Sequence, residues 1–259
     1  MLDIALVLLA GAVAGTMNAI GGGGTFVALP ALVAAGLPPV AANAASTVAL
    51  APGAVASAWV YRRELAPVGE TSVSALTAIS VTGGALGAVL LLVLPSASFG
   101  AAVPWLLAFA TLVLAFGRRV SRALSTATGR SAEARMSSRA VLVAQFLLAV
   151  YGGYFGGAIG IMLLAVWSIG LGLDTAASNP MRIAQVSAVN LSATALFLVA
   201  SDALRTPLVV ATMLAGGVAG GIAGAHLARR LPARLLRGTI LTIAVTMTVL
   251  YFLRGTKAG

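Results

Sequence analysis

The chain has 259 residues, of which 60% are hydrophobic and only 8% are charged, and its formal net charge is +10. A soluble domain carries roughly 25% charged residues to solvate its surface, so this composition excludes a soluble protein and requires lipid around most of the chain. The chain has no cysteine and a single histidine, His226, which excludes disulfides and thiolate, zinc or haem sites, so we predict no cofactor.

Apolar segments follow one another along the whole chain, and several reach or approach the roughly 20 residues that a membrane-crossing helix needs. The first half begins with two short segments separated by a glycine-rich break and continues with three longer spans, at about 4–20 and 25–35, then 41–60, 71–94 and 101–117. The second half repeats this order, at about 140–156 and 159–171, then 183–200, 207–226 and 238–253. We predict an all-α polytopic membrane protein with about 8–10 transmembrane segments. It is divided into a first repeat, a cytoplasmic basic linker and a second repeat, at 1–117, 118–139 and 140–259.

The two halves are predicted to be inverted repeats. Each half has an odd number of segments, so the second copy must enter the membrane upside down relative to the first. A slide of 136 positions superposes Gly21 on Gly157, Gly24 on Gly160, Gly36 on Gly172 and Asn43 on Asn179. A slide of 133 superposes Gly83, Gly84 and Gly87 on Gly216, Gly217 and Gly220. Small residues favour helix packing in membranes and match easily by chance, so parity and spacing carry most of the inference.

Basic residues gather in three short loops, which predicts the topology by the positive-inside rule. Placing these loops in the cytoplasm puts twelve of the sixteen basic residues inside: Arg62, Arg63, Arg118, Arg119, Arg122, Arg130, Arg135, Arg139, Arg229, Arg230, Arg234 and Arg237. This distribution fits a lipid bilayer as partner better than nucleic acid. We therefore predict a multi-pass protein of the inner (plasma) membrane with both termini outside, although Arg254 and Lys257 then violate the rule mildly.

The two glycine-rich breaks, residues 15–25 and 151–160, are the strongest pointers to function. Irregular backbone inside a bilayer is tolerated only where it is buried in protein or lines a watery cavity. Helices that begin at such breaks point their positive dipole ends toward the midplane, which suits an anion. We predict four converging helix starts, near Thr25, Asn43–Thr47, Gly160 and Asn179.

Less specific roles for the same residues stay open. The glycines would serve close helix packing, and Asn43 and Asn179 would cap helices. The hydroxyls of Ser46 and Thr47 would bond to their own helix backbone.

Arg182 is a conspicuous charge because it lies at the start of an otherwise apolar span. It would meet the substrate or gate its exit, but for an arginine at a helix end the sequence favours snorkelling to the interface or pairing with Asp174. Gln185 shares a helical face with Arg182, so we rank it, together with Asn18, above Asn190 as a cavity residue.

The order of these motifs resembles the sulfite exporter TauE/SafE family of membrane permeases. The resemblance covers essentially the whole chain and rests on the stretch from Asn18 to Thr25, Pro30, the turn Gly36-Leu37-Pro38 and the stretch from Ala41 to Thr47, with a weaker copy in the second half. It implies a transporter of sulfite, sulfonates or related small anions, often outward, and not an enzyme. The second copy departs from the pattern because Ala158 and Ile159 interrupt its glycine run, so the two half-sites would be unequal.

We therefore expect a secondary transporter that exports a small anion, bound near the midplane between two inverted broken-helix hairpins. The alternatives are a cation carrier that holds Na⁺ on freed carbonyls, a cation- or proton-coupled permease for a small carboxylate, and a non-transporting membrane assembly subunit. The oligomeric state stays open, with a homodimer as one option. The expected substrate-binding residues are Asn18, Gly21, Gly22, Gly23, Gly24, Thr25, Asn43, Ser46, Thr47, Tyr154, Gly157, Gly160, Asn179, Arg182 and Gln185.

Overall fold

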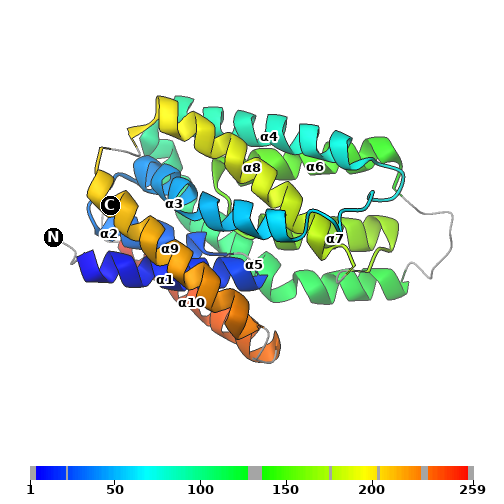
Figure 1. Cartoon of the computed structure of the whole chain (residues 1–259). Coiled ribbons are helices and arrows are strands. Elements are labelled where there is room, and N and C mark those ends of the chain that lie inside the picture. The colour runs from blue at the N-terminus through cyan, green and yellow to red at the C-terminus, as the bar shows by residue number, and fades with distance from the viewer. Residues whose placement is uncertain are drawn as a thin grey trace.

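The computed structural model describes residues 4–21, 23–127, 136–174, 177–202, 205–228 and 233–255. The regular elements in these ranges are all helices, which confirms the all-α class. They are α1 (Ile4–Gly21), α2 (Thr25–Ala34), α3 (Pro39–Val60), α4 (Val73–Val93), α5 (Ser96–Ala127), α6 (Ser138–Tyr154), α7 (Ile159–Leu171), α8 (Asn179–Ala200), α9 (Pro207–Ala228) and α10 (Ala233–Gly255). They form an elongated bundle (Figure 1).

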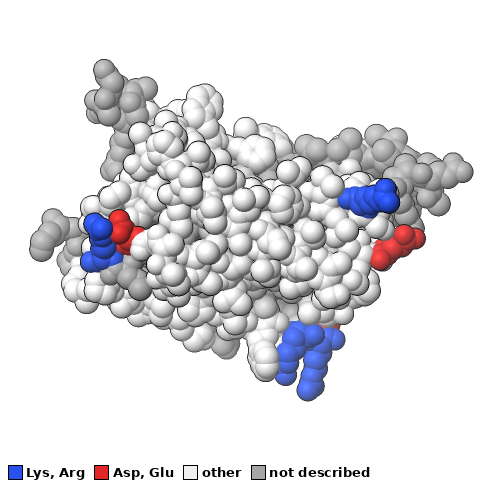
Figure 2. Space-filling view, turned by 90° about the horizontal axis from the view of Figure 1, so that it is seen from above, with Lys and Arg blue, Asp and Glu red and all other residues white. Residues whose placement is uncertain are grey.

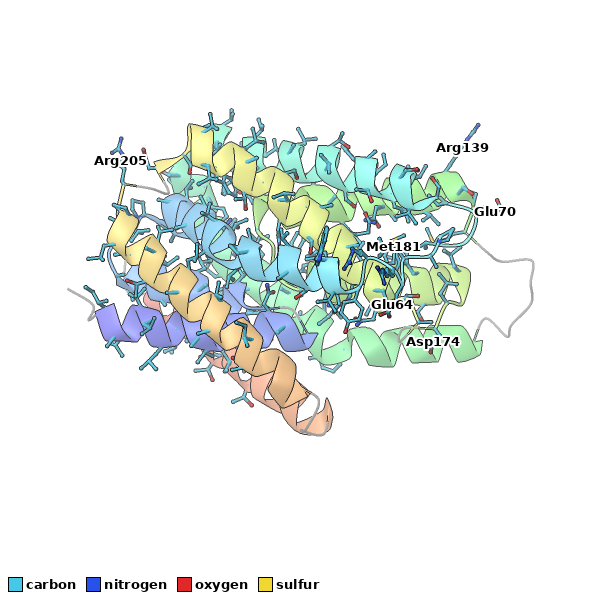
Figure 3. The ribbon with its side chains drawn as sticks, in the orientation of Figure 1. Glu64, Glu70, Arg139, Asp174, Met181 and Arg205 are labelled. Atoms are coloured by element: carbon cyan, nitrogen blue, oxygen red, sulfur yellow. The ribbon has the colours of Figure 1, made fainter. Side chains whose placement is uncertain are left out.

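The surface of the bundle is that of a polytopic membrane protein. Within the described ranges, five helices are long and apolar enough to cross a membrane: α3, α4, the Ser96–Val113 part of α5, α8 and the Pro207–Gly224 part of α9. Figure 2 shows charged side chains at the left and right ends of the molecule and at one place on its lower edge, with uncharged surface between them. Arg139, Glu70 and Asp174 lie at one end and Arg205 at the other (Figure 3). We call these the Arg139 end and the Arg205 end.

The two broken hairpins enter the bundle from opposite ends (Figure 1). Helix α1 begins at the Arg205 end and α2 returns toward it, whereas α6 begins at the Arg139 end and α7 returns there. Helix α10 ends at the same end of the bundle at which α1 begins (Figure 1). Which face of the membrane this is, and the inverted repeat itself, stay predictions.

Glycines bring helix backbones into direct contact at two interfaces, where α1 packs on α9 and α6 packs on α4. A Cβ atom on Gly15 would collide with the carbonyl of Gly217, and one on Gly153 would collide with the carbonyl of Gly84. Only glycine permits so close an approach. The matched glycines of α4 and α9 therefore serve helix packing.

Two helix starts differ from the predicted ones. Helix α3 begins at Pro39, so the prediction of a helix start at Asn43–Thr47 is wrong. Proline is well suited to the first turn because its φ is already helical and it has no N–H to satisfy. Asn43 therefore lies in the second turn of α3, whereas Asn179 is the first residue of α8. The starts of α3 and α8 correspond at an offset of 140 positions, about one helical turn away from the predicted 136.

Helix α5 is longer than the predicted span 101–117 and continues to Ala127. The first ten residues of the predicted basic linker are thus helical. Residues 128–135 lie outside the described ranges.

Candidate functional site

In each break a residue of positive φ lies at the start of the returning helix. In the first break Gly23 has φ 100° and its carbonyl accepts from the N–H of Phe26 at 3.0 Å. In the second, Ala158 has φ 59° and its carbonyl accepts from the N–H of Ile161, also at 3.0 Å. The two positions differ by one residue relative to the helix start, because Gly23 precedes Gly24, the N-cap residue of α2, whereas Ala158 is itself the N-cap residue of α7. Alanine tolerates φ near 59° at a modest cost, which explains how the second copy forms its break without an unbroken glycine run.

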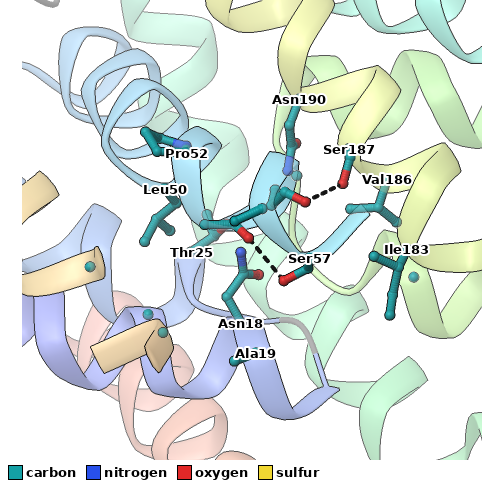
Figure 4. A pocket seen from close by; sticks show the side chains of 18 of the residues that line it. Asn18, Ala19, Thr25, Leu50, Pro52, Ser57, Ile183, Val186, Ser187 and Asn190 are labelled. Atoms are coloured by element: carbon teal, nitrogen blue, oxygen red, sulfur yellow. Dashed lines mark hydrogen bonds between the residues drawn. The ribbon is translucent and has the colours of Figure 1, made fainter. Parts of the chain in front are cut away.

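A cavity of about 450 Å³ lies between the two breaks. Both breaks contribute backbone to its wall, and helices α1, α3, α8 and α9 supply the remaining wall. Figure 4 shows side chains from α1, α3 and α8 that point into it. Its polar lining residues are Asn18, Thr25, Thr47, Ser57, Arg182, Ser187 and Asn190. Its larger apolar lining residues include Leu50, Ile183, Val186, Val218 and Ile222.

Arg182 is the one charged side chain among the described residues that line this cavity. It is only 9% exposed, so it does not snorkel to the surface as the sequence favoured. Its Nε donates a hydrogen bond to Oδ1 of Asn179 at 2.9 Å, which fixes the guanidinium beside the start of α8. A Cβ atom on Gly160 would lie 2.8 Å from Nη1 of Arg182. The guanidinium therefore lies against the N-terminal turn of α7, and both favour negative charge.

The other polar groups of the cavity fall into two kinds. The hydroxyls of Thr47, Ser57 and Ser187 donate to helix carbonyls, at 3.1 Å to Asn43, 2.9 Å to Gly53 and 2.7 Å to Ala54 respectively. Among hydrogen bonds between described residues, none occupies the side chains of Asn18, Thr25 or Asn190. These three side chains can therefore offer donors to a bound molecule, beside the positive charge of Arg182.

The family model described as Sulfite exporter TauE/SafE matches residues 7–251. The chain belongs to this family. No curated protein and no solved structure matches the TauE/SafE chain. Membership makes it a membrane transporter, in agreement with its apolar helices.

The structure brings six of the predicted site residues of the TauE/SafE protein together at the cavity. They are Asn18, Gly23, Thr25, Thr47, Gly160 and Arg182. Gly21 ends α1, and Gly22 lies outside the described residues. The remaining predicted residues are not in the cavity wall: Gly24, Asn43, Ser46, Tyr154, Gly157, Asn179 and Gln185. Of the four predicted helix starts, those of α2 and α7 line the cavity. The first turn of α8 contributes Arg182 to the lining. Helix α3 lines the cavity only from Thr47 onward.

Gln185 belongs to a separate buried cluster, which reverses its predicted ranking above Asn190. Its Oε1 accepts from Oγ of Ser80 at 2.8 Å, and Ser80 also accepts from Nε2 of Gln145 at 2.7 Å. The Nε2 of Gln185 reaches Oγ1 of Thr77 and Sδ of Met181, both at 3.2 Å. We call these five residues the Ser80 cluster. It joins α4, α6 and α8 away from the cavity.

Sequence reasoning missed Ser187 and the central part of α3, and it undervalued Asn190. A usable signal was present on α8, where Val186 and Asn190 follow Arg182 at spacings of four and eight and all three line the cavity. Residues at these spacings lie on one helical face. The α3 segment around Pro52 carried no comparable polar signal.

Proposed function

We propose that this TauE/SafE protein is a secondary transporter that binds a small organic anion in the cavity beside Arg182. The observation that carries the proposal is the charge of the lining. Its one charged group is a buried arginine, and no described Asp or Glu lies in the wall. A guanidinium in a cavity wall attracts an anion and matches the geometry of a carboxylate or sulfonate. A bound anion would also meet the first turns of α2 and α7.

The size of the cavity supports an organic anion rather than a bare oxyanion. Water occupies about 30 Å³ per molecule in the liquid, so sulfite, only a few times larger, would leave most of the 450 Å³ empty or hydrated. Sites for organic ligands have comparable volumes and mostly apolar walls. Ile183 and Val186 provide such a wall on the same helix as Arg182, and Leu50 lines the opposite side (Figure 4). A sulfonate or carboxylate with a short apolar body fits this arrangement.

Corresponding contacts in the two halves support a carrier built from inverted repeats. On α9, Gly216 approaches Leu8 and Ala12 of α1, and Gly220 approaches Ala12. On α4, Gly83 approaches Phe146 and Val150 of α6, and Gly87 approaches Val150. The offsets are the same throughout, 133 between α4 and α9 and 138 between α1 and α6. Such repeats place a substrate near the midplane and let one half rock against the other.

The experiment is thermal unfolding of the purified protein with an anion panel. Sulfite, sulfoacetate and an aromatic sulfonate should each raise the melting temperature, and the organic sulfonates should do so at lower concentration. Asn179→Ala retains the charge of Arg182 but removes its hydrogen bond, so it should weaken this stabilisation less than Arg182→Gln does. A shift with Na⁺ alone, and none with any anion, would favour the cation carrier instead.

A further inference from the structure

We propose that the contact between Asn43 and Tyr154 is the gate that closes the cavity toward the Arg205 end. The inference rests on the proposed function, because it treats the cavity as a transport path. Asn43 does not line the cavity, but it lies one helical turn from Thr47, which does. Since α3 begins at the Arg205 end, Asn43 lies between the cavity and that end.

The cavity reaches exposed residues toward the Arg139 end. It extends along α3 as far as Val60 and along α9 as far as Ile222, which are 65% and 61% exposed. These residues lie toward the Arg139 end of their helices. Toward the Arg205 end, the side chains next to Thr47 are buried, and Asn43 and Ser46 are each only 1% exposed. In the proposed mechanism, this arrangement is the state that is open toward the Arg139 end.

A hydrogen bond between described residues joins the two sides of this closure. Nδ2 of Asn43 donates to the carbonyl of Tyr154 at 2.9 Å. Tyr154 is the last residue of α6, where the break leaves carbonyls without a helical partner. Its ring packs edge-on against Phe99 of α5, with centroids 5.4 Å apart. Asn43 thus ties α3 to the end of α6 directly next to Gly156, which lines the cavity.

Two features fit a contact that breaks during transport. Oδ1 of Asn43 is buried without a hydrogen-bond partner among the described residues, so the amide is only half satisfied in this state. At the offset of 140 that matches the two helix starts, Asn43 corresponds to Ile183. Ile183 lines the open side of the cavity and has no side-chain donor. The position of the second half that matches Asn43 thus cannot form the same hydrogen bond.

The absence of native cysteine allows a direct test. Ser57→Cys places one thiol in the cavity wall, and a membrane-impermeant maleimide is added to sealed vesicles of either orientation. The Ser57→Cys protein should react from the Arg139 end only. Adding Asn43→Ala or Asn43→Leu should raise the labelling rate from the Arg205 end at least tenfold. Ser46→Ala is the matched control, because Ser46 is equally buried and its hydroxyl bonds only within α3.

Labelling from the Arg205 end that stays at the Ser57→Cys rate in both Asn43 variants would overturn the proposal. Loss of folding in both variants would also overturn it, because a gate contact must be dispensable for the fold. Reaction from the Arg139 end at an unchanged rate shows that the cavity is intact. Since labelling requires no substrate, a failure of the gate is distinguishable from a failure of anion binding.

Discussion

The Ser80 cluster gives a prediction in which two neighbouring substitutions have different outcomes. Ser80 links two amides, so Ser80→Ala leaves both Nε2 of Gln145 and Oε1 of Gln185 without their partner. Gln145→Leu removes one hydrogen bond, but it also removes Oε1 of Gln145, which has no partner among the described residues. Ser80 then keeps its bond to Gln185. We expect Ser80→Ala to be clearly destabilising and Gln145→Leu to be nearly neutral.

The size of the difference follows from the number of buried groups left unpaired. Hydrogen bonds between membrane helices contribute about 0.6 kcal/mol on average and up to about 1.7, so two lost partners cost about 1–3 kcal/mol. For chains of this size about 1 kcal/mol corresponds to roughly 2–4 °C in the melting temperature, so Ser80→Ala should lower it by several degrees. For Gln145→Leu the loss of one bond is offset by relief of a buried unpaired oxygen, and leucine is close to glutamine in volume.

Thermal unfolding in one detergent, followed by circular dichroism, measures both variants and the double variant. Because the two substitutions share one hydrogen bond, their effects should not add. An equal loss of stability in Gln145→Leu and Ser80→Ala would refute the reasoning, since it would mean that Oε1 of Gln145 is satisfied in the folded protein.

Two further predictions concern the backbone. Gly220→Ala should destabilise the protein by about 1–3 kcal/mol, because its Cβ would collide with the carbonyl of Ala12. The adjacent Gly221→Ala has open space and should be neutral or stabilising by up to about 1 kcal/mol; equal melting temperatures for the two variants would contradict the packing account. Ala158→Gly should leave the melting temperature unchanged or slightly raised, since it removes a left-handed alanine that costs about 1–2 kcal/mol but adds the entropy cost of glycine. Ala158→Val should lower it, because a β-branched residue is strained at φ 59°, and a Val variant as stable as the parent would show that the break adopts another conformation.

The helices and both breaks could be predicted from the sequence because each depends on local properties. Long apolar runs set the spans, and glycine runs mark where the backbone leaves the helix. The predicted starts of α2 and α7, at Thr25 and near Gly160, agree with the structure to within one residue. The glycine pairs of α4 and α9 could be found for the same reason, since direct backbone contact requires glycine.

The errors arose where tertiary arrangement decides. The match of Asn43 with Asn179 failed because the segment between Gly172 and α8 is four residues longer than that between Gly36 and α3, which shifts the register by about one turn. Gln185 and Asn190 are both polar residues of one span, and only the packing of α8 against α4 decides which of them faces the cavity. The burial of Arg182, a residue of α8, likewise depends on Gly160, which lies in the first turn of α7.

The central claim is that Arg182 holds the transported anion. The most direct measurement is counterflow of a labelled organic sulfonate in proteoliposomes made from the parent, Arg182→Lys and Arg182→Gln. A hydrogen bond to a charged group contributes about 1.5–3 kcal/mol, so Arg182→Gln should raise the half-saturating concentration about 10- to 150-fold. Arg182→Lys keeps the charge but loses the planar guanidinium, so its half-saturating concentration should lie between those of the parent and Arg182→Gln. Unchanged half-saturation in Arg182→Gln, with the protein folded, would contradict the account.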